Sequence, residues 1–178
     1  MNQIALVTGA GRGVGQVTAI TLAQKGWTVV AAGRDKAAVD AVAKQAGGQS
    51  VGMVCDVSDQ ASVIELFKAI KDKYGRLDLL FNNAGVVAPG VALEELELKD
   101  WRNVVDVNIS GVFYCTQQAF ALMKTQSPMG GRIINNGSIS AQIPRPNSSA
   151  YTASKHAVTG LPRPPHSMVA LLISPLVK

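Results

Sequence analysis

The stretch Ile4-Ala5-Leu6-Val7-Thr8-Gly9-Ala10-Gly11-Arg12-Gly13-Val14-Gly15 decides the fold of this chain. Its apolar beginning predicts a buried strand over 4–8, and its glycines predict a turn that leads into a helix ending near Lys25. Glycines allow a backbone to approach a pyrophosphate, and a helix start offers free N–H groups and a positive dipole end. The spacing T-G-x-x-x-G-x-G is also compatible with a tight turn and close helix packing. Its position between a strand and a helix favours a dinucleotide-binding loop.

Composition and charge limit the classes of protein to which the chain can belong. With 178 residues, 47% of them hydrophobic and 16% charged, it is expected to fold as one domain. The net charge is +5, but the lysines and arginines are scattered along the chain, so the sequence does not predict a nucleic-acid partner. Cys55 and Cys115 have no metal or redox spacing, so we expect no metal and a cytoplasmic location. We expect no signal peptide before the first strand, and no membrane partner, because no apolar run approaches roughly 18 residues.

Strand and helix patterns alternate along the chain. Strands such as 4–7 and 77–81 are apolar on both faces, which is typical of a parallel sheet covered on both sides by helices. The sequence therefore predicts an α/β fold of three layers, a doubly wound parallel sheet of the Rossmann type. Its ligand crevice is expected outside the carboxyl ends of the strands. The predicted strands are 4–8, 27–32, 50–55, 77–82 and 131–136. One predicted helix ends near 25, others cover 36–45 and 99–124, one starts after Ser58 as its cap and ends near 74, and the last begins near 150.

Charged residues follow the second predicted strand. Arg34 comes directly after it, and Arg12 lies in the first glycine loop. Two guanidinium groups near a ribose suit a 2′-phosphate, because arginine binds phosphate through forked, charge-assisted hydrogen bonds. Asp35 could instead reach a free ribose diol, and either arginine could be a solvated surface charge. We predict NADP(H) over NAD(H) as the cofactor.

Polar residues also follow the third and fourth predicted strands. A carboxylate and an apolar residue, Asp56-Val57, could bind an adenine amino group and wall its ring, although Asp56 could equally cap a helix in competition with Ser58. In Asn82-Asn83-Ala84-Gly85 the amides could tie the strand ends to the first loop, and the two small residues leave room for a ribose. As structure alone, this second stretch is a turn.

The later part of the chain holds candidates for catalysis. Asn108 lies in mid-helix shortly before a glycine, which predicts a kink or a freed carbonyl group facing a cavity. Tyr151 and Lys155 are four residues apart, so they share one helix face. A nearby ammonium group lowers the pKa of a phenol, and such a pair can act as a general acid and base. A Tyr-x-x-x-Lys pair taken alone is more often a solvated surface pair.

Together, these motifs resemble the short-chain dehydrogenase/reductase family over residues 1 to about 161. The resemblance implies an NAD(P)-dependent oxidoreductase that transfers hydride between nicotinamide and a small carbonyl or alcohol substrate. It implies that Tyr151 exchanges a proton with the substrate oxygen and that Ser138 polarises this oxygen. Ser140 is a weaker candidate for the role of Ser138. Lys155 would bind the nicotinamide ribose and lower the Tyr151 pKa, and Asn108 would hold a water linking Lys155 to solvent. The cofactor-binding residues would be Thr8, Gly9, Gly11, Arg12, Gly13, Val14, Gly15, Arg34, Asp56, Val57, Asn83, Ala84, Gly85, Tyr151 and Lys155.

Residues 162–178 depart from the family. Pro162, Pro164 and Pro165 are expected to stop the Tyr151 helix. Two explanations stay open: an internal deletion that leaves a remnant of the sixth strand at 168–175, or a frameshift near Pro164. Either the fifth strand or a makeshift strand from the tail would then form the sheet edge, with no substrate lid. We expect weak cofactor binding or poor folding, and slow turnover.

Several functional questions stay open at the level of sequence. The alternative to an enzyme is a non-catalytic dinucleotide-binding remnant of one. The loop at 86–97 is apolar with a few acids, which favours an uncharged or apolar substrate. A homo-oligomer, dimer or tetramer, is expected if the surface of the long helix and the Tyr151 helix survives the change in the tail.

Overall fold

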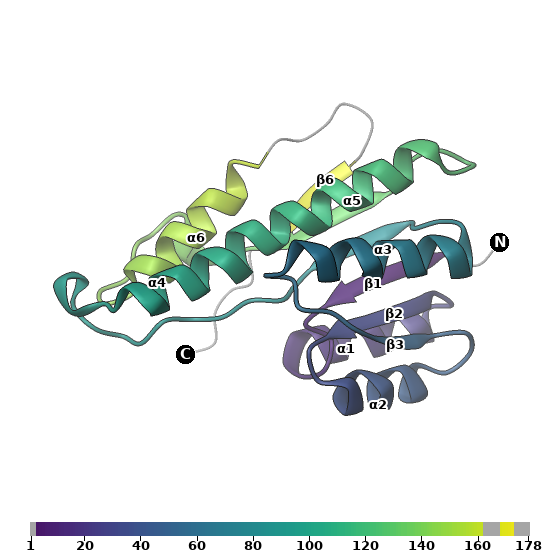
Figure 1. The fold of residues 1–178 in the computed structure, drawn as a ribbon, viewed down its shortest axis with the longest axis horizontal. Helices are drawn as coiled ribbons and strands as arrows, with labels where there is room; N and C mark the ends of the chain where they lie inside the picture. Colours follow the sequence, from purple (N-terminus) through teal and green to yellow (C-terminus); the bar gives the residue numbers. More distant parts are fainter. Residues whose placement is uncertain (1–2, 162–167, 173–178) are drawn as a thin grey trace.

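The computed structural model describes residues 3–161 and 168–172, which form a parallel sheet with helices on both faces (Figure 1). The strands pair in the order β3-β2-β1-β4-β5-β6, all in parallel. The order reverses direction between β1 and β4, and such a switch point is where doubly wound sheets bind ligands. The strands are β1 (Ile4–Thr8), β2 (Thr28–Gly33), β3 (Val51–Val54), β4 (Leu79–Asn82), β5 (Arg132–Asn136) and β6 (Met168–Leu172). The α-helices are α1 (Gly13–Gln24), α2 (Lys36–Ala46), α3 (Gln60–Tyr74), α4 (Leu98–Val105), α5 (Gly111–Thr125) and α6 (Ser149–Thr159).

The core consists of two layers, one on each face of the sheet. All five residues of β1 are buried. Leu6 points into a cluster with residues of α3 and α5, such as Phe67, whereas Val7 points into a cluster with residues of α1 and α2, such as Val39. Figure 1 shows α3 and α5 running side by side over one face of the sheet. The three-layer arrangement predicted from the two-sided apolar strands is confirmed.

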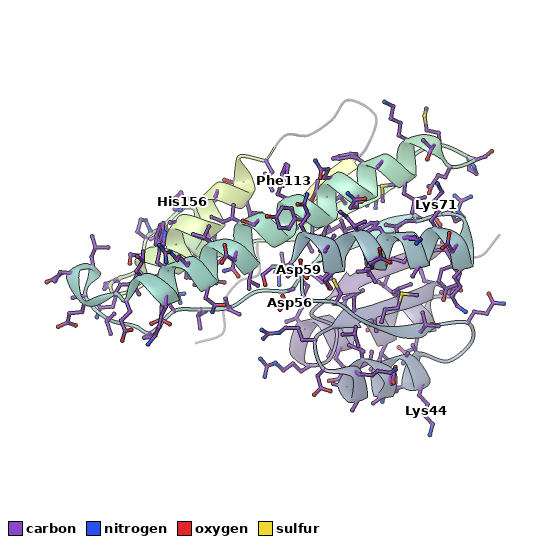
Figure 2. All side chains as sticks on the ribbon, in the orientation of Figure 1. Lys44, Asp56, Asp59, Lys71, Phe113 and His156 are labelled. Carbon is purple, nitrogen blue, oxygen red and sulfur yellow. The ribbon has the colours of Figure 1, made fainter. Side chains whose placement is uncertain are left out.

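The start of the third helix differs from the prediction. Asp59 caps α3, since its carboxylate accepts a hydrogen bond of 3.0 Å from the Ala61 N–H. Ser58 does not cap it and instead donates to the Asp56 carboxylate, from its N–H over 3.0 Å and its hydroxyl over 2.7 Å. Figure 2 shows Asp56 and Asp59 at the beginning of α3. A carboxylate accepts more strongly than a hydroxyl, which explains why the aspartate takes the cap.

The predicted long helix over 99–124 is interrupted. It consists of α4 and α5, separated by a π-helical turn at Asp106–Ser110 that contains Asn108. The N–H of Gly111 donates to the carbonyl of Asp106, five residues earlier. The predicted irregularity at Asn108 is therefore present as a π-turn, a form that is frequent at functional sites.

The tail supplies the outer strand of the sheet. β6 pairs in parallel with β5 along its whole length, from Arg132 beside Met168 to Asn136 beside Leu172. The sequence left open whether the fifth strand or a strand from the tail forms the edge of the sheet, and in the structure the strand from the tail forms it. α6 ends at Thr159, and Pro162, Pro164 and Pro165 lie outside the described residues. Among the described helices, none has the length and apolar character needed to cross a membrane.

Candidate active site

Close contacts in the first glycine loop leave no room for a side chain at Gly9 or at Gly15. Gly9 has a φ of 62°, a left-handed conformation that favours glycine. Gly15 lies in the first turn of α1, and a Cβ there would overlap the Gly9 carbonyl oxygen and lie 2.5 Å from the Asn83 side-chain nitrogen. The start of α1 therefore packs directly against the loop and against the end of β4. Its first turn contains no acidic residue that would oppose an anion.

A network of hydrogen bonds joins the ends of β1, β4 and β5. The Thr8 hydroxyl accepts from the N–H groups of Asn83 and Ala84, each over 3.0 Å. The Asn83 side chain donates to the Thr8 carbonyl over 2.9 Å, and its oxygen accepts from the Asn136 amide over 3.1 Å. The prediction that asparagines tie the strand ends to the first loop is confirmed. Thr8 is 2% exposed, so it positions the loop after β4 through hydrogen bonds and is not itself at the surface of the site.

A cleft of about 580 Å³ lies along the carboxyl ends of the strands. Thr8 and Gly15 are buried and do not line it. Val107 from the π-turn and Asn136 from the end of β5 also line the cleft, although the sequence did not predict them as site residues. The predicted cofactor residues that line the cleft are Gly9, Gly11, Arg12, Gly13, Val14, Arg34, Asp56, Val57, Asn83, Ala84 and Gly85.

Charges in this cleft are arranged around the start of α2. Arg12, Arg34 and Asp35 all line it. The Asp35 carboxylate is engaged as the cap of α2, where it accepts from the Ala38 N–H over 3.1 Å. Partial burial opposes ionisation of Asp56, but hydrogen bonds from Ser58 and the charge of Arg34 outweigh it and hold the Asp56 pKa below its ordinary value. Arg12 and Arg34 are therefore the cations of this cleft that can meet an anionic ligand.

Lys155 connects α6 to the cleft. Its ammonium donates a hydrogen bond of 2.7 Å to the carbonyl of Asn136, which lines the cleft. The residue is 8% exposed, and burial lowers the Lys155 pKa to about 8. A lysine in this state readily exchanges its proton near neutral pH.

Two cations lie near the aromatic ring of Tyr151. The Lys155 Nζ is 5.4 Å from the centre of its ring, and the Arg145 Cζ is 5.8 Å from the same centre. Tyr151 does not line the large cleft but lines a second pocket of about 220 Å³, between the loop after β4 and the start of α6. Within residues 3–161, no hydrogen bond joins its hydroxyl to Ser138.

Ser138 and Ser140 flank a short turn after β5. Ser138 is 2% exposed, and its hydroxyl accepts from the Ser140 N–H over 3.1 Å. The Ser140 hydroxyl is fully buried and has no hydrogen-bond partner in the described part of the chain. The structure thus ties the Ser138 oxygen into the turn that precedes the Tyr151 helix.

Asn108 bridges the loop after β4 and α6. Its side chain exchanges hydrogen bonds with the main chain of Val86, of 2.8 and 2.9 Å, and donates to the Ser154 hydroxyl over 3.1 Å. Both amide hydrogens are thereby used, so any part of Asn108 in holding a water falls to its oxygen atoms. The bridge fixes α6 relative to the cleft wall, because Val86 lines that wall.

Burial of Lys155 predicts a stability that depends on pH. With a folded pKa of about 8, against roughly 10.4 when unfolded, the unfolded chain binds more protons between these values. The unfolding free energy should therefore rise with pH in this window, relative to a Lys155→Met variant, by about 3 kcal/mol in all. Urea unfolding of both proteins at pH 7, 8.5 and 10 checks this. A difference that stays constant with pH would contradict the burial of a charged amine.

Comparisons with known proteins place the chain in a family. The family model for short chain dehydrogenase matches residues 3–168. The chain is 46% identical to a 3beta-hydroxysteroid dehydrogenase of Mediterraneibacter gnavus over 89% of its length, and 39% identical to a 3-oxoacyl-[acyl-carrier-protein] reductase of Synechocystis, also over 89%. It spans only 58% and 64% of these two relatives.

Solved structures agree with this assignment. A short-chain dehydrogenase/reductase of Burkholderia phymatum in complex with NAD superposes with a TM-score of 0.89, at 33% identity, over 97% of this chain and 65% of that chain. A metagenomic short-chain oxidoreductase in complex with NADP superposes with a TM-score of 0.84, at 32% identity, over 89% and 72% of the two chains. The extent of these matches shows that the chain belongs to the short-chain dehydrogenase/reductase family.

Proposed function

We propose that this chain transfers hydride between a nicotinamide cofactor and a small carbonyl or alcohol substrate. The observation that carries the proposal is the 2.7 Å hydrogen bond from Lys155 to Asn136, because it joins the Tyr151 helix to the wall of the large cleft. The relatives named above are dehydrogenases and reductases, and the solved neighbours bind NAD and NADP. The cleft, at about 580 Å³, has the size of a cofactor site, which is about 300–1,000 Å³.

The residues of the cleft fit a dinucleotide. The Gly13 and Val14 N–H groups, at the start of α1, would bind the pyrophosphate together with the positive end of the helix. Asp56 would accept from the adenine amino group, and its lowered pKa keeps it ionised for this task. Ala84 and Gly85 would lie against the ribose. The bound cofactor would supply or take up the hydride.

The residues beside the cleft would handle the proton. Tyr151 would give its hydroxyl proton to the oxygen of a carbonyl that is being reduced, or take it from an alcohol. The Lys155 ammonium, 5.4 Å from the ring centre, would stabilise the phenolate that remains. Ser138 would polarise the substrate oxygen, and Asn108 would hold α6 in place through Val86 and Ser154.

The second candidate function is binding of a dinucleotide cofactor without catalysis. It is favoured by the fact that neither Tyr151 nor Lys155 lines the large cleft. Thermal shift with NADPH and NADH, followed by loss of reduced-nicotinamide absorbance with a panel of carbonyl compounds, separates the two functions. Oxidoreductase activity requires both a thermal shift and an absorbance change, and the second candidate produces only the thermal shift.

Cofactor preference should depend on Arg34. We propose NADP(H), because Arg12 and Arg34 line the cleft while the Asp35 carboxylate caps α2. Arg34→Gln should weaken NADPH binding by about 10- to 100-fold and leave NADH binding within about twofold, since a hydrogen bond to a charged group contributes about 1.5–3 kcal/mol.

Isothermal titration of both cofactors measures this. Lys36→Gln is the matched control, because Lys36 follows in the same segment, pairs with Asp40 and does not line the cleft. Equal losses for NADPH and NADH in Arg34→Gln would refute the preference.

A further inference from the structure

The second pocket is distinct from the cofactor cleft and shares no lining residue with it. It measures about 220 Å³ and lies between the loop at 87–90 and the segment that leads into α6. Tyr151 lines it, so a molecule in this pocket touches the residue proposed to transfer the proton. Its chemical lining therefore bears on which substrate reaches Tyr151.

The only titratable cation in this lining is Arg145, and no carboxylate is part of it within the described residues. Arg145 is exposed and takes part in no salt bridge in residues 3–161. Its Cζ lies 5.8 Å from the Tyr151 ring centre, which orients the guanidinium over the ring. Glu97, the acid that follows the lining residue Leu96, is paired with Lys99 over 2.7 Å.

Backbone features of the same pocket add to the positive potential. Ser148, the cap of α6, makes no side-chain cap, and the first turn of the helix holds no acid. Ser149, Ala150 and Tyr151 all line the pocket, so the positive end of this helix faces it.

We propose that this pocket binds the carboxylate of a small oxo acid or hydroxy acid, with Arg145 as its specificity-determining residue. The inference rests on the proposed function. Hydride from the reduced cofactor would add to the carbonyl carbon while Tyr151 gives its proton to the carbonyl oxygen, producing a hydroxy acid and oxidised cofactor. The guanidinium binds a carboxylate through two parallel hydrogen bonds, which fixes the distance from the acid group to the reacting carbonyl.

This substrate class differs from the one expected from sequence. The loop at 86–97 is apolar with three acids, Glu94, Glu95 and Glu97, which favoured an uncharged or apolar substrate. In the structure, Val87, Ala88 and Pro89 form one wall of the pocket and Arg145 lies among the residues that complete it. The apolar wall suits the carbon chain of an oxo acid, and the arginine suits its charged end.

The test compares two ligands of equal size that differ in charge, 4-oxopentanoate and 4-oxopentanamide. Their dissociation constants are measured by ligand-observed NMR on the full chain, with and without NADPH, for the wild type, Arg145→Gln and Arg132→Gln. Arg132 is an exposed arginine at the opposite end of β5, so its variant controls for the loss of one charge. We expect the wild type to bind the acid at least about 10-fold more tightly than the amide, a preference that Arg145→Gln removes and Arg132→Gln keeps.

Each outcome decides one of the two proposals. If NADPH binds but the acid and the amide bind equally, or neither binds, the role of Arg145 is refuted, while cofactor binding, the first requirement of the oxidoreductase proposal, is met. If NADPH does not bind while the acid preference depends on Arg145, the pocket stands and the oxidoreductase proposal falls. If Arg132→Gln loses as much preference as Arg145→Gln, the effect is one of net charge, and the role of Arg145 is refuted.

Discussion

Tyr151→Phe is expected to lower the rate of hydride transfer by at least about 100-fold while NADPH binding stays within about twofold. General acid catalysis by a positioned side chain contributes about 10²–10⁴-fold, and phenylalanine keeps the ring but has no proton to give. The ring contacts of Lys155 and Arg145 remain, so the packing of α6 should not change. Single turnover with the protein in excess over NADPH, in the presence of a carbonyl substrate, measures the rate by loss of reduced-nicotinamide absorbance.

Tyr74→Phe is the control for this variant. It removes a phenol hydroxyl from the end of α3, where the group donates to the Gln49 carbonyl over 2.7 Å. Loss of that bond should cost about 1 kcal/mol of stability and leave the rate unchanged. If the Tyr151→Phe rate falls no further than the Tyr74→Phe rate, Tyr151 is not the acid.

Gly15→Ala should destabilise the fold by more than about 3 kcal/mol and abolish NADPH binding. The new methyl group would overlap the carbonyl of Gly9 and press on the Asn83 side chain, and both are held by the strand-end network. Because these neighbours are the backbone and a half-buried amide that is held by hydrogen bonds, the start of α1 must move away from the loop. Overpacking of this kind costs about 1–3 kcal/mol even where side chains can adjust, and more where backbone must shift.

Urea unfolding and NADPH titration measure both effects. Gly26→Ala is the matched variant, since its φ of 88° is strained for alanine but no atom lies within 4 Å of the added carbon. It should lose about 1–2 kcal/mol from the backbone alone and bind NADPH normally. Equal stability losses in the two variants would show that the close approach at Gly15 does not matter.

The sequence was most informative about local backbone structure and about which strand ends meet. The bounds of β1 agree with the prediction, because four consecutive apolar residues and Thr8 are followed by a glycine that needs a left-handed φ. The role of Asn83 in joining the loops was also predictable, since carboxyl ends of neighbouring parallel strands meet at one edge. These features depend on local sequence and on the direction of the strands.

Contacts between distant segments were not predictable in this way. The hydrogen bond from Lys155 to Asn136 joins α6 to the end of β5. Its acceptor is a main-chain carbonyl, which every residue has, so nothing in the sequence indicates this bond. The capping of α3 was decided by Asp59, one residue after the predicted Ser58, through competition among neighbouring acceptors. The second pocket arises because the loop after β4 meets the segment before α6 in space.

We propose that Tyr151 meets a nicotinamide ring whose dinucleotide lies across the first glycine loop. A crystal structure of this chain with NADPH would show whether it does. We expect the pyrophosphate against the N–H groups of Gly13 and Val14, the ribose beside Lys155, and the nicotinamide within reach of a substrate bound to the Tyr151 hydroxyl. A nicotinamide ring turned away from Tyr151, or a dinucleotide bound elsewhere on the chain, would contradict it.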